Sequence, residues 1–277
     1  MNIATDKRIK KVLVFDTETT PVYLPCEVKE VRGLSEPPRY NYLEGTIEEY
    51  VYNGKTYYKY KTNVEQKHIV FDIGWCIATK KGKILKKRSY LIEEVFTNME
   101  LMKNAYYFNK YPDYLISLNN RKTSIKKWRD IIHIMQNDIE DFSINEVYAY
   151  NIAFDLQAVK NTQQFILNKE MLLWKMYELK TNCLWGMACE TIFQQKGFKK
   201  IANEQGWLSP CGNYLTNAET CYKYLTSIYD FEEKHTALED SIIEVSIMAK
   251  CFATHKKMSF GVISQPWRLV NLKENED

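Results

Sequence analysis

The sequence lacks the marks of membrane and secreted proteins. Within its 277 residues, no apolar run approaches the roughly 20 residues that a membrane-spanning helix needs. Residues 1–10, MNIATDKRIK, contain no apolar stretch that could act as a secretion signal. We therefore expect an intracellular, cytoplasmic protein with no membrane partner.

The sequence also lacks a cysteine pattern typical of disulfide frameworks or zinc sites. Its seven cysteines are an odd number, include no C-x-x-C pair and are not grouped with histidines. Cys183 and Cys189 lie six residues apart without the second pair that a structural zinc site requires. We expect reduced thiols in the core.

A large excess of positive or negative charge is absent, because 38 basic and 35 acidic residues give a formal net charge of only +3. This argues against coating nucleic acid by bulk electrostatics and leaves any contact with phosphates to local basic patches. Three basic groups, residues 80–88, 121–129 and 196–200, are candidates for such patches, although groups of this kind are more often solvated faces. With 45% hydrophobic residues, the chain is long enough to bury the full core of a single domain.

The hydrophobic pattern predicts a mixed α/β sheet with helices packed on it. Residues 11–15 are apolar and β-branched, which is typical of a buried central strand. Residues 68–79 and 84–92 form an antiparallel hairpin around a turn at 80–83, and short strands follow at 146–150 and 182–185. Helical spacing covers residues 124–142, 154–167, 188–204 and 217–229, and a last helix after His235. Three antiparallel strands are therefore followed by alternating helices and strands.

Three acidic clusters stand in a fixed order along the chain. They are Asp16-Thr-Glu18, Asn151-Ile-Ala-Phe-Asp155 and His235-Thr-Ala-Leu-Glu-Asp240. Together they supply four carboxylates and one histidine. Hard oxygen ligands for Mg²⁺ or Mn²⁺ and one base that titrates near neutral pH are what a two-metal phosphodiester-cleaving site needs.

The first cluster has an ordinary alternative, since Asp-x-Glu is common on the solvated side of a strand. Side chains two apart on a strand point the same way, so Asp16 and Glu18 emerge together at the end of the first strand. Because that strand is predicted to be buried, the two acids lie beside an apolar core. Each raises the pKa of the other unless a cation neutralises both.

The other two clusters also have ordinary alternatives. Asn151 is a typical helix N-cap, Phe154 a core residue and Asp155 an acid favoured at the positive end of a helix, which still leaves Asp155 available as a ligand. Thr236 and Glu239 have the spacing of a capping box. This cap places His235 just outside the last helix and Asp240 in its first turns. The alternative is a histidine at a helix start and a surface acid.

The combined pattern resembles the three exonuclease motifs of the DEDD superfamily, histidine subclass, which includes polymerase proofreading subunits, oligoribonuclease and ribonuclease T. The matching segments are VFDTETT at 14–20, NIAFD at 151–155 and HTALED at 235–240, and the resemblance covers about residues 10 to 252. It implies a ribonuclease H-like fold and 3′-to-5′ hydrolysis that releases nucleoside 5′-monophosphates. It also implies two Mg²⁺ or Mn²⁺ ions held by Asp16, Glu18, Asp155 and Asp240, with His235 as the base. The tyrosine subclass carries Tyr at the position of this histidine.

The chain departs from this family in two places. About 45 residues, Val22 to Gln66, separate the first two strands, where the family has a short loop. Many relatives also have Asp-Thr where this chain has Asn182-Cys183. We therefore expect one exonuclease domain over residues 1–256, containing an inserted tyrosine-rich region at 22–66, and a C-terminal extension over 257–277.

The inserted region carries a strong hairpin signal. Asn53-Gly54 supplies the positive φ angles of a type I′ turn between two tyrosine-rich strands over residues 49–60. The hairpin is either an arm that stacks unpaired bases on tyrosines and contacts phosphates through Lys55, Lys59 and Lys61, or a structural element whose tyrosine rings are buried.

The expected substrate is nucleic acid, single-stranded and with a free 3′ end. Candidate substrate-binding residues are Thr17, Thr19, Asn151, Phe154, Tyr57 and Lys59. An endonuclease of the same fold and a non-catalytic binding module are the alternatives. A non-catalytic module is expected to have lost a ligand, and none is lost here. The sequence leaves open DNA or RNA and any polymerase partner.

Overall fold

The computed structural model describes residues 10–36, 47–168 and 179–271. The chain divides into two compact units, the first made of Met1–Thr20 and Ile69–Asp277 and the second of Pro21–His68. The second unit falls on the inserted region expected at 22–66, of which residues 37–46 lie outside the described residues. Residues 272–277 of the expected C-terminal extension also lie outside them. Within the described ranges, no helix is long and apolar enough to cross a membrane.

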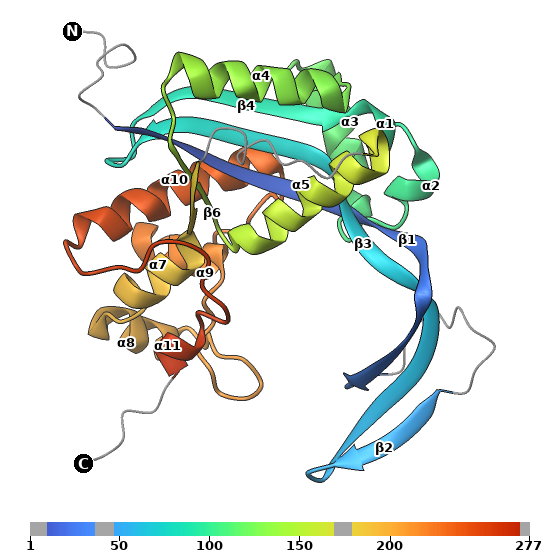
Figure 1. Ribbon diagram of the computed structural model, residues 1–277. Helices are drawn as coiled ribbons and strands as arrows, with labels where there is room; N and C mark the ends of the chain where they lie inside the picture. Colours follow the sequence, from blue (N-terminus) through green and yellow to red (C-terminus); the bar gives the residue numbers. More distant parts are fainter. Residues whose placement is uncertain (1–9, 37–46, 169–178, 272–277) are drawn as a thin grey trace, which may run out of the picture. The chain divides into compact units, whose positions relative to one another are not determined.

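A mixed sheet flanked by helices makes the protein an α/β structure, which confirms that part of the sequence prediction (Figure 1). The described residues form seven strands in the order β5-β4-β3-β1-β6-β7, with β2 paired to β3. β3 and β4 are antiparallel, whereas β4 with β5, β1 with β6 and β6 with β7 are parallel. The strands are β1 (Lys11–Leu34), β2 (Glu48–Tyr52), β3 (Lys55–Thr79), β4 (Ile84–Ile92), β5 (Ser124–Lys126), β6 (Glu146–Ala149) and β7 (Lys180–Cys183).

The helices follow the antiparallel part of the sheet and then alternate with the last strands. The described helices are α1 (Glu93–Phe96), α2 (Met99–Met102), the 3₁₀ helix η1 (Phe108–Lys110), α3 (Tyr111–Asn119), α4 (Trp128–Asp141), α5 (Ile152–Leu167), α7 (Leu184–Thr191), α8 (Lys196–Glu204), α9 (Ala218–Thr226), α10 (Ala237–Ala253) and α11 (Arg268–Asn271).

Helices cover both faces of the sheet within the first unit, and β3 shows why. Side chains alternate between faces along a strand. Ile73 packs with residues of α4 and α5, whereas the neighbouring Gly74 meets the backbone of α10. Figure 1 shows α4 and α10 on opposite sides of the strands.

The core on the α10 side of the sheet contains several thiols. Cys76 of β3 packs there with Val12 and Val14 of β1 and with residues of α7, α8, α9, α10 and α11. Val270 of α11 belongs to this core and Met258 packs against it, so these two residues of the expected C-terminal extension pack on the first unit. All seven cysteines are free, and five of them are buried, as expected for core thiols. Cys26 is half-buried and Cys211 is exposed.

Strand β1 is much longer than the sequence pattern predicts. It continues from Phe15 to Leu34, so Asp16 and Glu18 lie inside the strand and not at its end. Threonines and valines follow the acids, and β-branched residues favour extended backbone even where the apolar run stops. The strand predicted to begin near residue 68 is β3, and it likewise begins earlier, at Lys55.

Two predicted helices differ from the structure. Residues 124–126 form strand β5 beside β4, and the helix begins at Trp128. Ile125 is 38% exposed and so is not part of the buried face of α4. The single helix expected at 188–204 is two helices, because Gln195 takes an extended conformation before α8. Buried apolar residues occur on both sides of the break, so periodicity does not reveal it.

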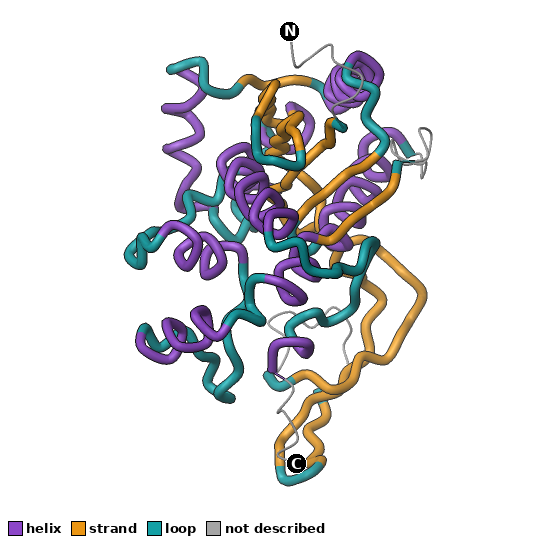
Figure 2. Tube along the Cα trace, turned by 90° about the vertical axis from the view of Figure 1, so that its left-hand side faces the viewer, coloured by secondary structure: helices purple, strands orange, loops and turns teal. Residues whose placement is uncertain are grey.

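The second unit contains the predicted hairpin. Tyr52 of β2 pairs with Lys55 of β3 across Asn53 and Gly54, whose φ angles are +50° and +72°. Figure 2 shows the two strands side by side up to this turn. A two-residue loop with both φ angles positive has the geometry of the predicted turn.

The sheet and α10 come very close at Gly74, which leads to a first prediction. A Cβ atom at residue 74 would lie 2.2 Å from the backbone nitrogen of Leu238. Gly74→Ala should therefore push α10 away from β3 and lower the free energy of unfolding by about 1–3 kcal/mol, as measured by urea denaturation. Unchanged stability would show that α10 does not need this close approach.

Candidate metal centre

The first turn of α10 is held on β3 by three contacts. The backbone N–H of Ala237 donates to the carboxylate of Asp72 at 3.0 Å. The hydroxyl of Ser241 donates to the carbonyl of Gly74 at 2.9 Å, beside the close approach already described. These contacts fix where the side chains of the first turn of α10 lie relative to the strands.

The predicted capping box is not formed, although Thr236 does occupy the N-cap position. Its backbone is extended, as at most N-caps, but its side chain caps no backbone N–H. The hydroxyl donates instead to the carboxylate of Glu239 at 3.0 Å. The two side chains of the expected box therefore pair with each other, whereas Asp72, from β3, accepts the backbone N–H of Ala237 at the helix start.

His235 lies just outside α10, as predicted, and its imidazole is fixed from several sides. Its backbone is left-handed, with φ +50°. The ring stacks on Tyr107, with 4.1 Å between ring centroids and 12° between ring planes. The hydroxyl of Tyr114 lies 3.3 Å from the carbonyl oxygen of His235 and 3.1 Å from Asp72. Lys110 lies over the ring of Tyr107 and donates to the carbonyl of Lys234 at 2.8 Å.

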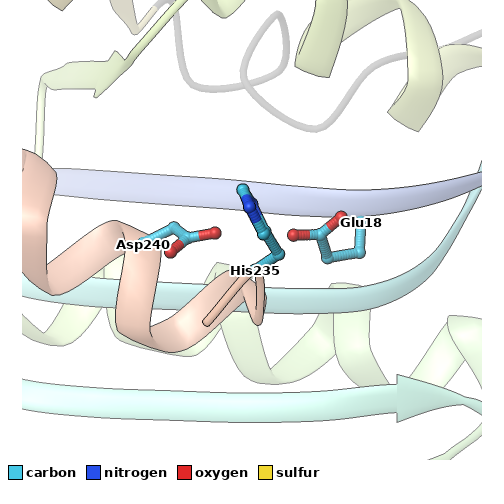
Figure 3. Close-up of side chains that lie close together, drawn as sticks. All are labelled: Glu18, His235 and Asp240. Atoms are coloured by element: carbon cyan, nitrogen blue, oxygen red, sulfur yellow. The ribbon is translucent and has the colours of Figure 1, made fainter. Parts of the chain in front are cut away.

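Glu18, His235 and Asp240 converge on one point. Their ligand atoms all lie within 4.8 Å of one another. Figure 3 shows the two carboxylates turned toward the imidazole, Glu18 from β1 and Asp240 from α10. The alternation of β1 places Glu18 and Asp16 on the same face as Val12 and Val14, which pack in the core beneath α10.

Asp155 joins this centre from the first turn of α5. Its side chain is 2% exposed, and the hydroxyl of Thr17 donates to it at 2.7 Å. Asn151 occupies the N-cap position of α5, but in the left-handed conformation and without a side-chain cap. Phe154 is 40% exposed, so the alternative interpretation that made it a core residue is wrong. At 100° per residue it lies off the stripe of α5 that buries Ile152, Asp155 and Val159.

Burial raises the pKa values of all four predicted ligands, and repulsion from neighbouring carboxylates adds to it at Asp16, Glu18 and Asp240. Burial is the largest cause in each case. It raises the pKa of Asp155 to about 7 and that of Asp240 to about 8. The pKa values of Asp16 and Glu18 are raised well above the ordinary range by burial and then by neighbouring carboxylates: Asp155 acts most strongly on Asp16, and Asp240 on Glu18. Lys110 partly offsets the repulsion at Glu18 and Asp240.

The structure adds acids that the sequence interpretation missed. Glu244 is 2% exposed and accepts the backbone N–H of Tyr150 at 2.8 Å, and burial raises its pKa. It follows Asp240 by four residues on α10, a spacing that puts both on one helical face and could have revealed it. Asp72 gave no such signal, because its partner Ala237 is 165 residues away.

A third missed acid, Glu233, lies beside the base candidate. Its carboxylate is 3.8 Å from Nδ1 of His235, and burial raises its pKa to about 7. Glu219, Glu233 and His235 form a second group whose ligand atoms lie within 4.8 Å of one another. Glu219 is already engaged, since it accepts from Lys223 at 2.6 Å and from the backbone N–H of Glu233 at 3.3 Å.

The first group could hold a divalent cation. Oδ1 of Asp240 is buried and has no hydrogen-bond partner within the described part of the chain. Carboxylate oxygens are the ligands that Mg²⁺ prefers, and a cation at this point would relieve the repulsion that raises the pKa values. Asp16 and Asp155 belong to neither group of three. Their carboxylates interact electrostatically with each other, and Asp16 also interacts with Glu18 and Asp240.

The residues expected to bind substrate have different surroundings. Thr17 is buried and engaged with Asp155, and Thr19 is half-buried, whereas Asn151 is exposed. Tyr57 and Lys59 belong to the second unit. There Tyr57 stacks on Tyr50 with 5.9 Å between ring centroids, and Lys59 forms an ion pair with Glu48 at 2.6 Å.

The raised pKa values predict how stability depends on pH when metal is absent. The folded pKa values of Asp155 and Asp240 are about 7 and about 8, and the ordinary value for both is 3.8. At any pH between the ordinary and the folded value, the folded state therefore binds more protons than the unfolded state. In EDTA the free energy of unfolding should therefore rise as the pH is lowered from about 8 to about 6. Denaturation at several pH values measures this, and Asp240→Asn should flatten the dependence. A stability that increases with pH across this range would contradict the raised pKa values.

The comparisons with known proteins assign no family to this geometry. No family model matches the chain, and no curated protein matches it.

Proposed function

We propose that the protein is a metal-dependent 3′-to-5′ exonuclease that acts on single-stranded nucleic acid and releases nucleoside 5′-monophosphates. One observation carries the proposal. Glu18 and Asp240, more than two hundred residues apart in the chain, converge with His235 within 4.8 Å. Asp16 and Asp155, which complete the expected set, interact electrostatically with each other.

The sheet supports the finer assignment to a ribonuclease H-like fold and to the histidine subclass of DEDD exonucleases. An antiparallel pair, β3 and β4, stands beside the parallel strands β1, β6 and β7. The three motifs lie on β1, at the junction of β6 and α5, and at the start of α10. This is the order that the resemblance implies.

The carboxylates would hold two Mg²⁺ or Mn²⁺ ions, and the ligands would be Asp16, Glu18, Asp155 and Asp240. When bound, such ions polarise the phosphodiester and lower the pKa of a bound water. The protein supplies the frame. Asp72, Gly74 and Ser241 fix the helix that carries Asp240 to the strand beside β1.

His235 would accept the proton of the attacking water. Burial and the charge of Lys110 lower the pKa of its imidazole, so the ring is neutral at physiological pH and has a free lone pair. Stacking on Tyr107 keeps the ring beside Glu18 and Asp240. A base needs this combination of a neutral ring and a fixed position.

The test of the activity uses matched 5′-labelled DNA and RNA oligonucleotides with Mg²⁺, Mn²⁺ or EDTA. An exonuclease yields a ladder that shortens from the 3′ end, and a blocked 3′ terminus stops it. Cleavage of the blocked substrate would indicate an endonuclease. Binding without cleavage under all conditions would indicate a non-catalytic module and overturn the proposal.

Replacement of single ligands should abolish most of the activity without unfolding the protein. Asp16→Asn, Glu18→Gln, Asp155→Asn and Asp240→Asn each remove a charge that the cations need. Glu239→Gln is the matched control, because Glu239 is next to Asp240 but pairs with Lys234 at the surface. Turnover and melting temperature are measured for all five variants. Native turnover in the folded Asp240→Asn variant would refute its role as a ligand.

Replacement of the histidine should slow turnover more than it weakens binding. We expect His235→Ala to lower kcat by about 10²–10⁴-fold, the usual contribution of a positioned general base. Little stability should be lost, because His235 lies outside α10. A variant that cleaves at nearly the native rate across the neutral pH range would leave His235 without a role as base.

A further inference from the structure

Two basic groups that are distant in the sequence meet in one groove. The groove has a volume of about 680 Å³ and runs along β4, the turn after α3, and β5. We call it the edge groove. Its basic residues are Lys87, Arg88, Arg121 and Lys122, and no acidic residue lines it.

Three of these cations have no counter-charge. Within the described residues, no ion pair involves Lys87, Arg121 or Lys122, and all three side chains are exposed. Arg88 is different, because its guanidinium donates to Asp138 at 3.1 Å. Asp138 also pairs with Lys86, so even here two cations share one carboxylate. The groove is therefore locally positive although the whole chain is nearly neutral.

Hydrogen bonds hold the two segments that line the groove against each other, so its backbone has a defined geometry. Ser89 donates to the hydroxyl of Thr123 at 2.8 Å across the groove, and Tyr90 pairs with Ser124 where β5 begins. Residues 84–89 of β4 have no strand partner on the β5 side among the described strands. Backbone groups of an edge strand therefore add hydrogen-bonding capacity to the positive charge.

Arg121 occupies a backbone position that favours glycine. It follows α3 with φ +56°, in a turn where its N–H donates to the carbonyl of Leu118 and the N–H of Lys122 donates to that of Ser117. This is the Schellman arrangement, in which the left-handed residue is usually Gly or Asn. Gly or Asn would suit this position better, so the turn itself does not account for the arginine side chain.

We propose that the edge groove binds the phosphodiester backbone of single-stranded nucleic acid, apart from the candidate metal centre. Phosphate groups would find the uncompensated charges of Lys87, Arg121 and Lys122 there, and each contact releases condensed counterions. The choice of nucleic acid among polyanions rests on the proposed function. The groove and the candidate metal centre share no residue.

The test compares two variants that lose the same charge. Lys87→Gln, Arg121→Asn and Lys122→Gln are combined in the groove variant, in which Asn keeps the left-handed position of residue 121. Lys196→Gln, Lys199→Gln and Lys200→Gln on α8 form the control. Binding of a labelled single strand to each full-length protein in EDTA is measured by fluorescence anisotropy over a series of NaCl concentrations.

The groove variant should reduce the slope of log affinity against log salt by about 2, since each phosphate contact contributes about 0.7 for a single strand. The control should keep the native slope. An unchanged slope, or an equal loss in both variants, would overturn the proposal. If the triple variant is unstable, Arg121→Asn alone should reduce the slope by about 0.7, and no reduction would overturn the proposal.

Two further arms separate the groove from the proposed function. Polyglutamate that competes as well as the oligonucleotide would overturn the choice of nucleic acid. Cleavage of a dinucleotide should be unchanged in the groove variant, because so short a substrate reaches the metal centre alone. A wild-type protein that binds through the groove but never cleaves would disprove the exonuclease and leave the groove standing.

Discussion

Repulsion among buried and half-buried carboxylates is the constraint on which the first unit depends. Burial raises the pKa values of Asp16, Glu18, Asp155 and Asp240, and neighbouring carboxylates raise those of Asp16, Glu18 and Asp240 further. Glu244 adds a fifth acid to the same region. Such an arrangement opposes folding unless protons or cations neutralise it. In the folded state these acids therefore need either bound protons or a bound cation.

The fold withstands this repulsion because other contacts fix the elements that carry the acids. Thr17 donates to Asp155, and the backbone of Tyr150 donates to Glu244, so β1, the β6–α5 junction and α10 are tied at the centre. The carboxylate of Asp72 accepts the backbone N–H of Ala237, the first residue of α10. The helix dipole favours an acid at this end of the helix. The apolar core beneath α10 supplies the remaining stability.

The sequence was most informative where the signal is local. Asn53-Gly54 predicted its turn because positive φ angles are a property of those two residues. The start of α10 was predicted from the helical stripe after His235. The length of β1 could not be predicted, since pairing with neighbouring strands keeps a polar segment extended.

In the candidate site, too, local signals were predictive and long-range contacts were not. Its acids were predicted from motifs, but the contacts that place them join residues far apart in the chain, as Asp72 and Ala237 do. Gly74 has no sequence signal of its own, although it decides how near α10 comes to the sheet. The edge groove likewise depends on two segments whose meeting no local pattern encodes.

The close approach at Gly74 also determines which parts of the site can adapt. Main chain rests there on main chain, so α10 can come no nearer to β3, whatever occupies the centre. Any tightening around a bound molecule therefore has to come from elements other than α10, or from rotation of individual side chains. The helix that carries Asp240 is thus set at its distance from the sheet in advance, and an entering molecule has to fit against a His235 ring that Tyr107 already holds in place.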